Sequence, residues 1–201
     1  MSGSGKSTLV KLLIDFFEPS SGEILINQHP LKLVDKHIIR SFINYVPQEP
    51  YIFSGSIEDN LRLGNRANIT LAEIEKACKT AMIAADIEKM PLQFNTNLDE
   101  NGNTLSGGQK QRLTIARALL SPAKILIFDE STSGLDTITE KKLIDNLTKL
   151  SDKTIIFIAH RLAVAQRTDK ILVLHEGKLV EQGSHAELMR KQGYYYNLVN
   201  S

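Results

Sequence analysis

The chain has 201 residues and a formal net charge of +1, with 24 Lys and Arg against 23 Asp and Glu. This balance argues against a basic nucleic-acid-binding surface, and the single cysteine, Cys78, excludes a disulfide framework. No run reaches the roughly 18 apolar residues of a transmembrane helix, and Met1 is not followed by the charged and then apolar residues of a signal peptide. A membrane role would therefore come through a partner or through another part of the polypeptide.

The chain begins with residues typical of a phosphate-binding loop. Gly3-Ser4-Gly5-Lys6-Ser7-Thr8 contains the Gly-Lys-Ser end of the P-loop pattern, whose first glycine would precede Met1. We expect backbone N–H groups of this stretch to bind phosphate, Lys6 to reach the β- and γ-phosphates, and the Ser7 hydroxyl to ligate Mg²⁺. Apolar residues from Leu9 to Phe17 predict a helix that begins near Gly5. A flexible Gly/Ser tail is the alternative interpretation.

The next elements alternate between short strands and helices. A turn at residues 19–22 precedes a predicted strand over 23–27, a short helix over 35–39 and a buried strand over 42–46. The two prolines of Pro47 to Pro50 then predict a loop.

Residues from about 52 to 105 have a different character and predict an all-helical insert. Thr70 and Glu73 form a capping box. The helix that follows has one apolar face, made of Leu71, Ile74, Ala77, Cys78, Ala81, Met82 and Ala85. Cys78 is thus interpreted as core packing, and residues 95–103 as a polar loop.

Predicted strands then alternate with helices again, which favours a parallel sheet. Apolar runs predict strands over 125–128 and 154–159, separated by a helix over 137–150. Residues 171–174 and 178–181 predict a hairpin around Glu176-Gly177, and a second capping box at Ser184 begins a C-terminal helix.

Two adjacent acids follow the strand that ends at Phe128. An acid at the carboxyl end of a central strand can hold Mg²⁺ through water, which fits Asp129. Glu130 fits a group that orients and polarises an attacking water. The alternative is that both acids only solvate a loop.

Leu105-Ser106-Gly107-Gly108-Gln109 is the most specific stretch. Ser106 and Gln109 form a capping box, and the two glycines leave backbone N–H groups bare for an anion. A second phosphate site in one chain suggests that two copies combine their half-sites.

This stretch resembles the signature sequence of ATP-binding cassette (ABC) ATPases. The resemblance implies that Ser106, Gly107, Gly108 and Gln109 close over the γ-phosphate held by a second copy. It also implies that Gln48 contacts nucleotide, Mg²⁺ and a membrane domain, that the loop from Ser133 to Asp136 crosses the dimer interface, and that His160 holds the γ-phosphate. Lys6, Gln48, Glu130 and His160 are then the catalytic residues, and Ser7, Gln48 and Asp129 the Mg²⁺ ligands.

The implied fold is α/β, a P-loop NTPase core with a mainly parallel sheet and an inserted all-helical signature subdomain. The whole chain, residues 1–201, would be one ABC ATPase domain. Residues 1–51 and 120–201 would form the core, and residues 52–119 the helical subdomain.

Further residues resemble exporters whose ATPase is fused to six membrane helices. They are Ile52 to Leu61, Ile158 to Leu162 and Gly193 to Tyr196. Asp99 to Gly102 departs from the usual Gly-Glu-Arg-Gly, and with Met90 to Leu92 and Thr139 to Lys141 looks more like peptidase-containing exporters of bacteriocins and competence peptides. The resemblance implies ATP hydrolysis that powers peptide export, at the cytoplasmic face of the bacterial plasma membrane.

The partners so implied are a second ATPase copy and a transmembrane domain of the same polypeptide, with no nucleic acid. The family's first strands and its adenine-stacking aromatic would precede Met1, so we expect the chain alone to bind ATP weakly and hydrolyse little. A soluble ABC protein acting on DNA or ribosomes, and an inactive fragment, are the alternatives.

Overall fold

The computed structural model of the chain describes residues 4–65, 68–159 and 162–200. It separates into two compact units, one of Met1–Ile39 with Phe157–Ser201 and one of Arg40–Ile156. Helix α2 (Lys36–Phe42) and strand β7 (Thr154–Ile158) run across the boundary between them.

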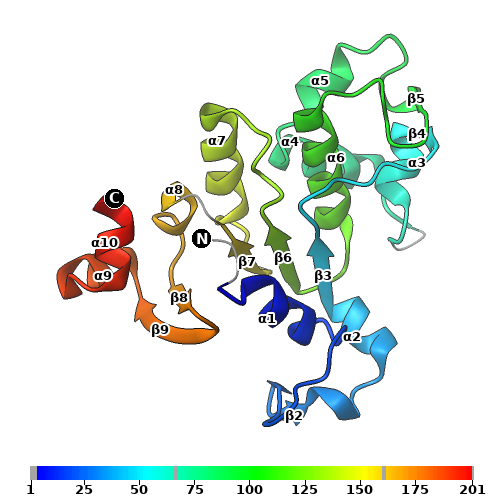
Figure 1. The fold of residues 1–201 in the computed structure, drawn as a ribbon. Coiled ribbons are helices and arrows are strands. Elements are labelled where there is room, and N and C mark those ends of the chain that lie inside the picture. The colour runs from blue at the N-terminus through cyan, green and yellow to red at the C-terminus, as the bar shows by residue number, and fades with distance from the viewer. Residues whose placement is uncertain (1–3, 66–67, 160–161, 201) are drawn as a thin grey trace. The chain divides into compact units, whose positions relative to one another are not determined.

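The unit of residues 40–156 contains a parallel pair of strands. Strand β3 (Ile43–Val46) pairs with β6 (Ile125–Asp129), and Ile43 lies opposite Ile125. Strand β6 lies between β3 and β7 in this sheet. In Figure 1 the arrows of β3 and β6 point the same way and end at the same edge. The polar residues that follow these strands therefore gather at one edge of the sheet.

Strand β6 is buried along most of its length. Leu126, Ile127 and Phe128 are at most 1% exposed. Such a run is typical of a strand that is covered on both faces. The predicted strand over 125–128 is thus confirmed.

Short helices fill most of the segment between β3 and β6. They are α3 (Ile57–Arg62), α4 (Leu71–Thr80), α5 (Ala84–Glu88), the 3-10 turn η2 (Gln93–Asn95) and α6 (Gly107–Leu120). Helices α3 and α4 pack against α6. A two-residue antiparallel pair, β4 (Gly55–Ser56) with β5 (Asn97–Leu98), also lies within this mainly helical segment and falls partly in the predicted loop over 95–103.

The single predicted helical face from Leu71 to Ala85 is wrong in extent. Helix α4 ends at Thr80, Met82 has φ 61°, and α5 begins at Ala84. A positive φ is incompatible with a continuous right-handed helix. Ala85, beyond this break, is exposed, and so is Leu71 in the first turn of α4. Cys78 is fully buried, and its burial raises the pKa of the thiol to about 12. Cys78 is therefore a core residue, as expected.

Helix α7 (Thr137–Leu147) follows β6 and ends three residues before the predicted boundary. Its N-cap is Asp136, whose carboxylate accepts hydrogen bonds from the backbone N–H groups of Ile138 and Thr139. A carboxylate is a favoured cap because it satisfies free N–H groups and lies at the positive end of the helix dipole.

The other unit begins with helix α1 (Lys6–Leu13). The prediction that this helix continues to Phe17 is wrong. Asp15 has φ 55°, and Phe16 and Phe17 are 70% and 46% exposed. The predicted strand over 23–27 shortens to β1 (Leu25–Ile26), because Asn27 and Gln28 turn the chain with positive φ into β2 (His29–Pro30). Short turn η1 (Leu31–Leu33) follows.

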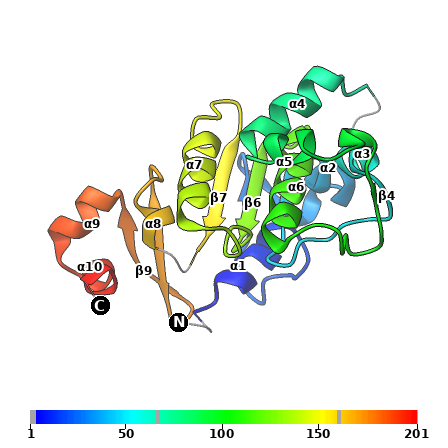
Figure 2. The same cartoon turned by 90° about the horizontal axis from the view of Figure 1, so that it is seen from above.

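The remaining elements of this unit pack around one small core. They are α8 (Leu162–Ala165), β8 (Ile171–His175), β9 (Lys178–Gly183), α9 (His185–Lys191) and α10 (Tyr194–Asn200). Figure 2 shows β9 beside α9 and α10, and the buried residues are Ile171, Val173, Leu188 and Tyr195.

The predicted hairpin is confirmed. Strands β8 and β9 pair antiparallel around Glu176 and Gly177, which both have positive φ, as a tight hairpin turn requires. Within the described part of the chain, no helix has both the length and the apolar character needed to cross a bilayer.

Candidate functional site

The N-terminus of α1, the predicted phosphate-binding segment, begins at a left-handed glycine. Gly5 is its N-cap with φ 91°, a left-handed conformation that favours glycine. The Gly5 carbonyl accepts a hydrogen bond of 2.9 Å from the N–H of Leu9, so the helix begins where the sequence predicts. Gly3, also a predicted phosphate ligand, lies outside the described residues.

Lys6 lies folded against this loop. Its Nζ donates a 2.7 Å hydrogen bond to Oγ of Ser4, and Ser4 is buried. Ser7 and Thr8 are exposed on the first turn of α1. The ammonium group and two hydroxyls are thus gathered around a helix N-terminus, where anions are favoured.

The turn of the β8–β9 hairpin supports the same loop. The N–H of Gly177 donates to the carbonyl oxygen of Ser4 at 3.3 Å. A Cβ on Gly5 would lie 3.4 Å from Cα of Gly177. Sequence reasoning missed this contact, because nothing in the pattern of residues 171–181 indicates where the turn packs.

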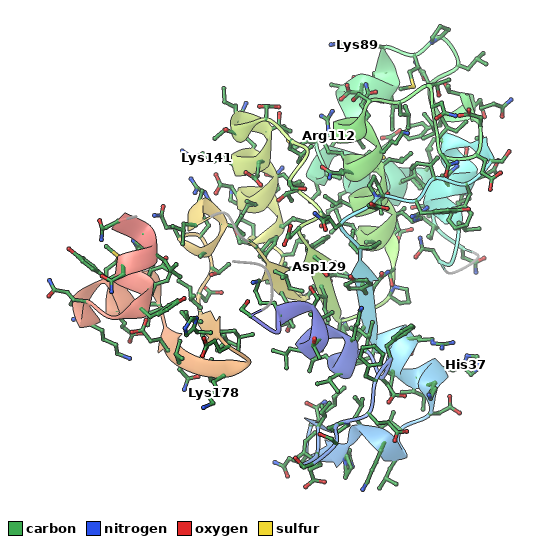
Figure 3. All side chains as sticks on the ribbon, viewed as in Figure 1. His37, Lys89, Arg112, Asp129, Lys141 and Lys178 are labelled. Carbon is green, nitrogen blue, oxygen red and sulfur yellow. The ribbon has the colours of Figure 1, made fainter. Side chains whose placement is uncertain are left out.

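Asp129 lies at the end of β6 (Figure 3). It is bound by a tyrosine of the neighbouring strand. The hydroxyl of Tyr45 donates to Oδ2 of Asp129 at 2.8 Å, and Asp129 as a residue is only 9% exposed. Tyr45 lies opposite Ile127, two residues before Asp129, so both side chains leave the same face of the sheet. Burial, then the hydrogen bond to Asp129 and its charge, raise the pKa of Tyr45 to about 12.

Gln48 and Glu130 meet at the same edge. Nε2 of Gln48 donates to Oε2 of Glu130 at 3.2 Å, although 82 residues separate them. Glu130 has φ 49°, which is uncommon for a residue with a side chain and costs backbone strain that is often found at functional sites. The structure therefore brings together three predicted site residues, namely Gln48, Asp129 and Glu130.

The signature stretch begins α6 as predicted. Oγ of Ser106 accepts from the N–H of Gln109, and Oε1 of Gln109 accepts from the N–H of Ser106 at 2.9 Å. A Cβ on Gly107 would meet nothing within 4 Å, so this turn faces open space. A ligand or a second chain has room to approach the helix N-terminus there.

Asp86 of α5 ties down the start of α6. Its carboxylate accepts from Nε2 of Gln109 at 2.9 Å and pairs with Nη1 of Arg112 at 3.2 Å. Arg112, seen on α6 in Figure 3, also donates to the carbonyl oxygen of Met82 at 2.7 Å. Sequence reasoning missed Asp86, because its position on a short helix carries no motif.

The loop from Ser133 to Asp136, predicted to cross a dimer interface, adjoins α6. The N–H of Gly134 donates to Oε1 of Gln111 at 3.1 Å. A side-chain hydrogen bond with Thr139, and then hydrogen bonds from the backbone N–H groups of Thr139 and Ile138, lower the pKa of the Asp136 carboxyl group. This keeps the loop's last residue ionised as a helix cap.

A cavity of about 310 Å³ begins beside the Gln48 loop. Its lining includes Tyr45, Pro47, Phe53, Leu63, Thr114 and Arg117. At its border the rings of Tyr51 and Phe53 meet edge to face at 4.6 Å, and both are more than a third exposed. Arg117 holds the pair, with its guanidinium 5.3 Å from the ring of Phe53 and a hydrogen bond to the carbonyl oxygen of Tyr51.

The predicted site is divided between the two units. Ser4 to Thr8 belong to the first, while Gln48, Ser106 to Gln109, Asp129, Glu130 and Asp136 belong to the second. His160, the predicted γ-phosphate ligand, lies outside the described residues. Among the residues described, no three His, Cys, Asp or Glu side chains cluster as a metal site would need.

Comparison with known proteins matches these features to one family. Residues 1–133 match the family described as ABC transporter. The chain is 58% identical to the pediocin PA-1 transport/processing ATP-binding protein of Pediococcus acidilactici, 57% to the lactococcin-A transport/processing ATP-binding protein of Lactococcus lactis subsp. lactis, and 51% to the transport/processing ATP-binding protein ComA of Streptococcus pneumoniae. Each match covers 100% of this chain and 28% of the relative, so the chain spans under a third of their length.

A solved structure is also similar over the whole chain. It is that of a bacterial Atm1-family ABC exporter with ATP bound, with 41% identity and a TM-score of 0.92. The similarity covers 100% of this chain and 35% of that one. The mixed α/β fold with its helical segment is therefore that of an ABC exporter's ATP-binding part.

Proposed function

This chain belongs to the ABC transporter family, and we propose that it binds and hydrolyses ATP to power export of a peptide across the bacterial plasma membrane. The observation that carries the catalytic part is the hydrogen bond between Gln48 and Glu130 at the edge where β3 and β6 end. Beside it lies Asp129, buried and bound to Tyr45. Phosphoryl transfer from ATP to water needs one carboxylate that orients the attacking water and another that binds a cation.

The residues present fit Mg²⁺. Mg²⁺ prefers hard oxygen ligands and is commonly bound by one or two carboxylates together with substrate phosphates. The carboxylate of Asp129, the hydroxyl of Ser7 and the amide oxygen of Gln48 are such donors, and they would hold the ion. When bound, Mg²⁺ neutralises charge on the β- and γ-phosphates.

The chain's own groups supply the remaining steps. The N–H groups at the start of α1 and the ammonium of Lys6 bind the phosphates. Glu130 orients a water toward the γ-phosphorus and takes its proton as the water oxygen bonds to phosphorus and the bond to the bridging oxygen of ADP breaks. The amide of Gln48 holds the carboxylate in place. His160 binds the γ-phosphate in this scheme, as the family resemblance implies.

The second half of the site comes from another copy of the chain. Ser106 to Gln109 begin α6 with an open face at Gly107, where backbone N–H groups and the helix dipole favour an anion. In this proposal they close over the γ-phosphate of the second copy, and the Ser133 to Asp136 loop contacts that copy.

The relatives support the proposed peptide cargo and the proposed membrane partner. Their names describe transport and processing of pediocin and lactococcin, which supports a peptide cargo, and this chain covers 28% of their length. We assign the remaining length to a transmembrane domain of the same polypeptide, which places the ATPase at the cytoplasmic face. The cavity beside Pro47, with the exposed pair Tyr51 and Phe53, would receive a cytoplasmic segment of that domain.

Substitution Glu130→Gln in the full-length exporter tests this function. Gln keeps the length and an acceptor for Gln48 but cannot take a proton from water. We expect ATP hydrolysis to fall by roughly 10²–10⁴-fold, with ATP affinity unchanged and peptide export into membrane vesicles lost. Glu88→Gln, an exposed acid on α5, is the matched control. Undiminished steady-state hydrolysis in Glu130→Gln would remove Glu130 from its role.

A further inference from the structure

A buried glutamine links the signature helix to the loop that follows Glu130. Gln111 lies in the second turn of α6 and is only 7% exposed. Its Oε1 accepts the 3.1 Å hydrogen bond from the N–H of Gly134. A buried carboxamide has to be hydrogen-bonded, so this contact accounts for a polar residue on the inner face of α6.

The shapes of the two segments fit each other closely. A Cβ on Gly134 would lie 2.9 Å from Oε1 of Gln111, closer than carbon and oxygen normally approach. A Cβ on Gly108 would lie 3.3 Å from Cδ2 of Leu135, which is itself buried. Two glycines thus permit the loop and the signature helix to pack in contact.

The loop is also anchored on its other sides. Oγ1 of Thr132 donates to Oε1 of Glu140 at 2.7 Å, and both side chains are buried. The N–H of Ser133 donates to the carbonyl oxygen of Glu130 at 3.0 Å. This hydrogen bond joins the loop to the backbone of Glu130. A shift of Gly134 would therefore also shift Glu130.

We infer that Gln111 is a positioning residue that holds the 133–136 loop against the signature segment of its own chain. Through this bond one chain presents both segments to a second copy as a single rigid surface and keeps Glu130 in place. The inference rests on the proposed function, because it assigns Gln111 to the same hydrolysis reaction. Gln111 itself touches neither nucleotide nor water in this role.

The test compares two substitutions in the full-length exporter. Gln111→Met keeps the length but replaces the acceptor oxygen, whereas Gln111→Glu keeps an oxygen at the same position. We expect Gln111→Met to lower kcat for ATP hydrolysis by roughly tenfold, with KM within about twofold, because the lost hydrogen bond acts on positioning and not on nucleotide binding. Gln111→Glu should restore most of kcat.

Two further measurements separate positioning from general destabilisation. Lys110→Met places the same side chain one position earlier on α6, at a half-exposed site, and should leave kcat unchanged. Amide hydrogen exchange of residues 131–136 should accelerate in Gln111→Met alone, since the N–H of Gly134 loses its acceptor. A merely structural role would lower the amount of folded protein without this pattern.

Gly134→Ala disrupts the same contact from the exposed loop, and it tests the inference if Gln111→Met fails to fold. It should lower kcat, and combining it with Gln111→Met should add little, since both break one interaction. Normal kcat in Gly134→Ala, normal kcat in Gln111→Met, or equal losses in folded Gln111→Met and Gln111→Glu would each overturn the inference. An unmodified exporter without ATPase activity would instead refute the proposed function, and hydrogen exchange would still test the contact.

Discussion

At the scale of single residues, the pair of Tyr45 and Asp129 shows how the sheet holds the carboxylate that we propose as a Mg²⁺ ligand. A carboxylate on a residue that is 9% exposed would be costly without a partner. The hydroxyl of Tyr45 supplies one at 2.8 Å, and the parallel register places it on the correct face. The same hydrogen bond raises the pKa of Tyr45, after the larger contribution of burial. The tyrosine thus orients Asp129 without adding charge.

Substitution Tyr45→Phe should reveal this pair through the pH dependence of stability. The pKa of Tyr45 rises from 10.0 to about 12, so the unfolded chain loses this proton at lower pH than the folded one. The contribution of Tyr45 to stability is therefore complete below pH 10 and is lost as the pH rises toward 12. Urea midpoints of the 201-residue chain between pH 8 and 12 should fall more steeply for the wild type than for Tyr45→Phe. Parallel curves would contradict this account.

At the scale of elements, helix α6 depends on its N-terminal turn and on its neighbour α5. The capping box of Ser106 and Gln109 satisfies N–H groups that no helical carbonyl can reach. Gln109 uses its other amide group to bind Asp86, which also pairs with Arg112. One carboxylate therefore orients the last residue of the signature stretch and joins two helices.

Substitution Asp86→Ala should loosen this arrangement. It leaves Nε2 of Gln109 and the guanidinium of Arg112 with one partner fewer. This should lower the free energy of unfolding by about 1–3 kcal/mol. We expect the unfolding midpoint of the 201-residue chain to fall by roughly 2–12 °C, measured by circular dichroism. Glu88→Ala, on the exposed side of α5, should shift it by less than about 2 °C. Equal midpoints for the two variants would show that Asp86 does not anchor α6.

At the scale of the whole molecule, the proposed reaction needs groups from both units and from two chains. The phosphate loop lies in the unit of residues 1–39 and 157–201, and the carboxylates and the signature lie in the unit of residues 40–156. If the signature acts on the other copy's nucleotide, each chain contributes half of two sites. A defect in the phosphate loop and a defect in the signature segment should then leave one working site when they lie on different chains. They should leave none when they lie on the same chain.

Mixed exporters made from two differently tagged chains test this arrangement. A pair of Lys6→Ala with Ser106→Arg retains one complete site if sites form between chains. A pair of wild type with the double variant Lys6→Ala, Ser106→Arg retains none. We expect ATP hydrolysis in the first pair only, measured on doubly purified protein. Activity confined to the second pair would show that one chain holds a complete site by itself.

The sequence by itself determined the features that depend on neighbouring residues. The capping boxes at Thr70, Ser106 and Ser184 and the hairpin turn at Glu176 and Gly177 are confirmed, because caps and tight turns are set by a few consecutive residues. The apolar run of β6 likewise predicted its burial. The motif residues identified the family for the same reason, since each signature is a short local pattern.

Only the tertiary structure decided which distant residues meet and where helices stop. Tyr45 with Asp129, Gln48 with Glu130, Asp86 with Gln109, and Gly134 with Gln111 join positions 23 to 84 residues apart. These contacts depend on strand register and helix packing, which no local pattern encodes. The early end of α1 at Leu13 and the break at Met82 have the same origin, because apolar spacing continues through both positions while the backbone turns away. Local chemistry thus specified the site's components, and the path of the chain specified their assembly.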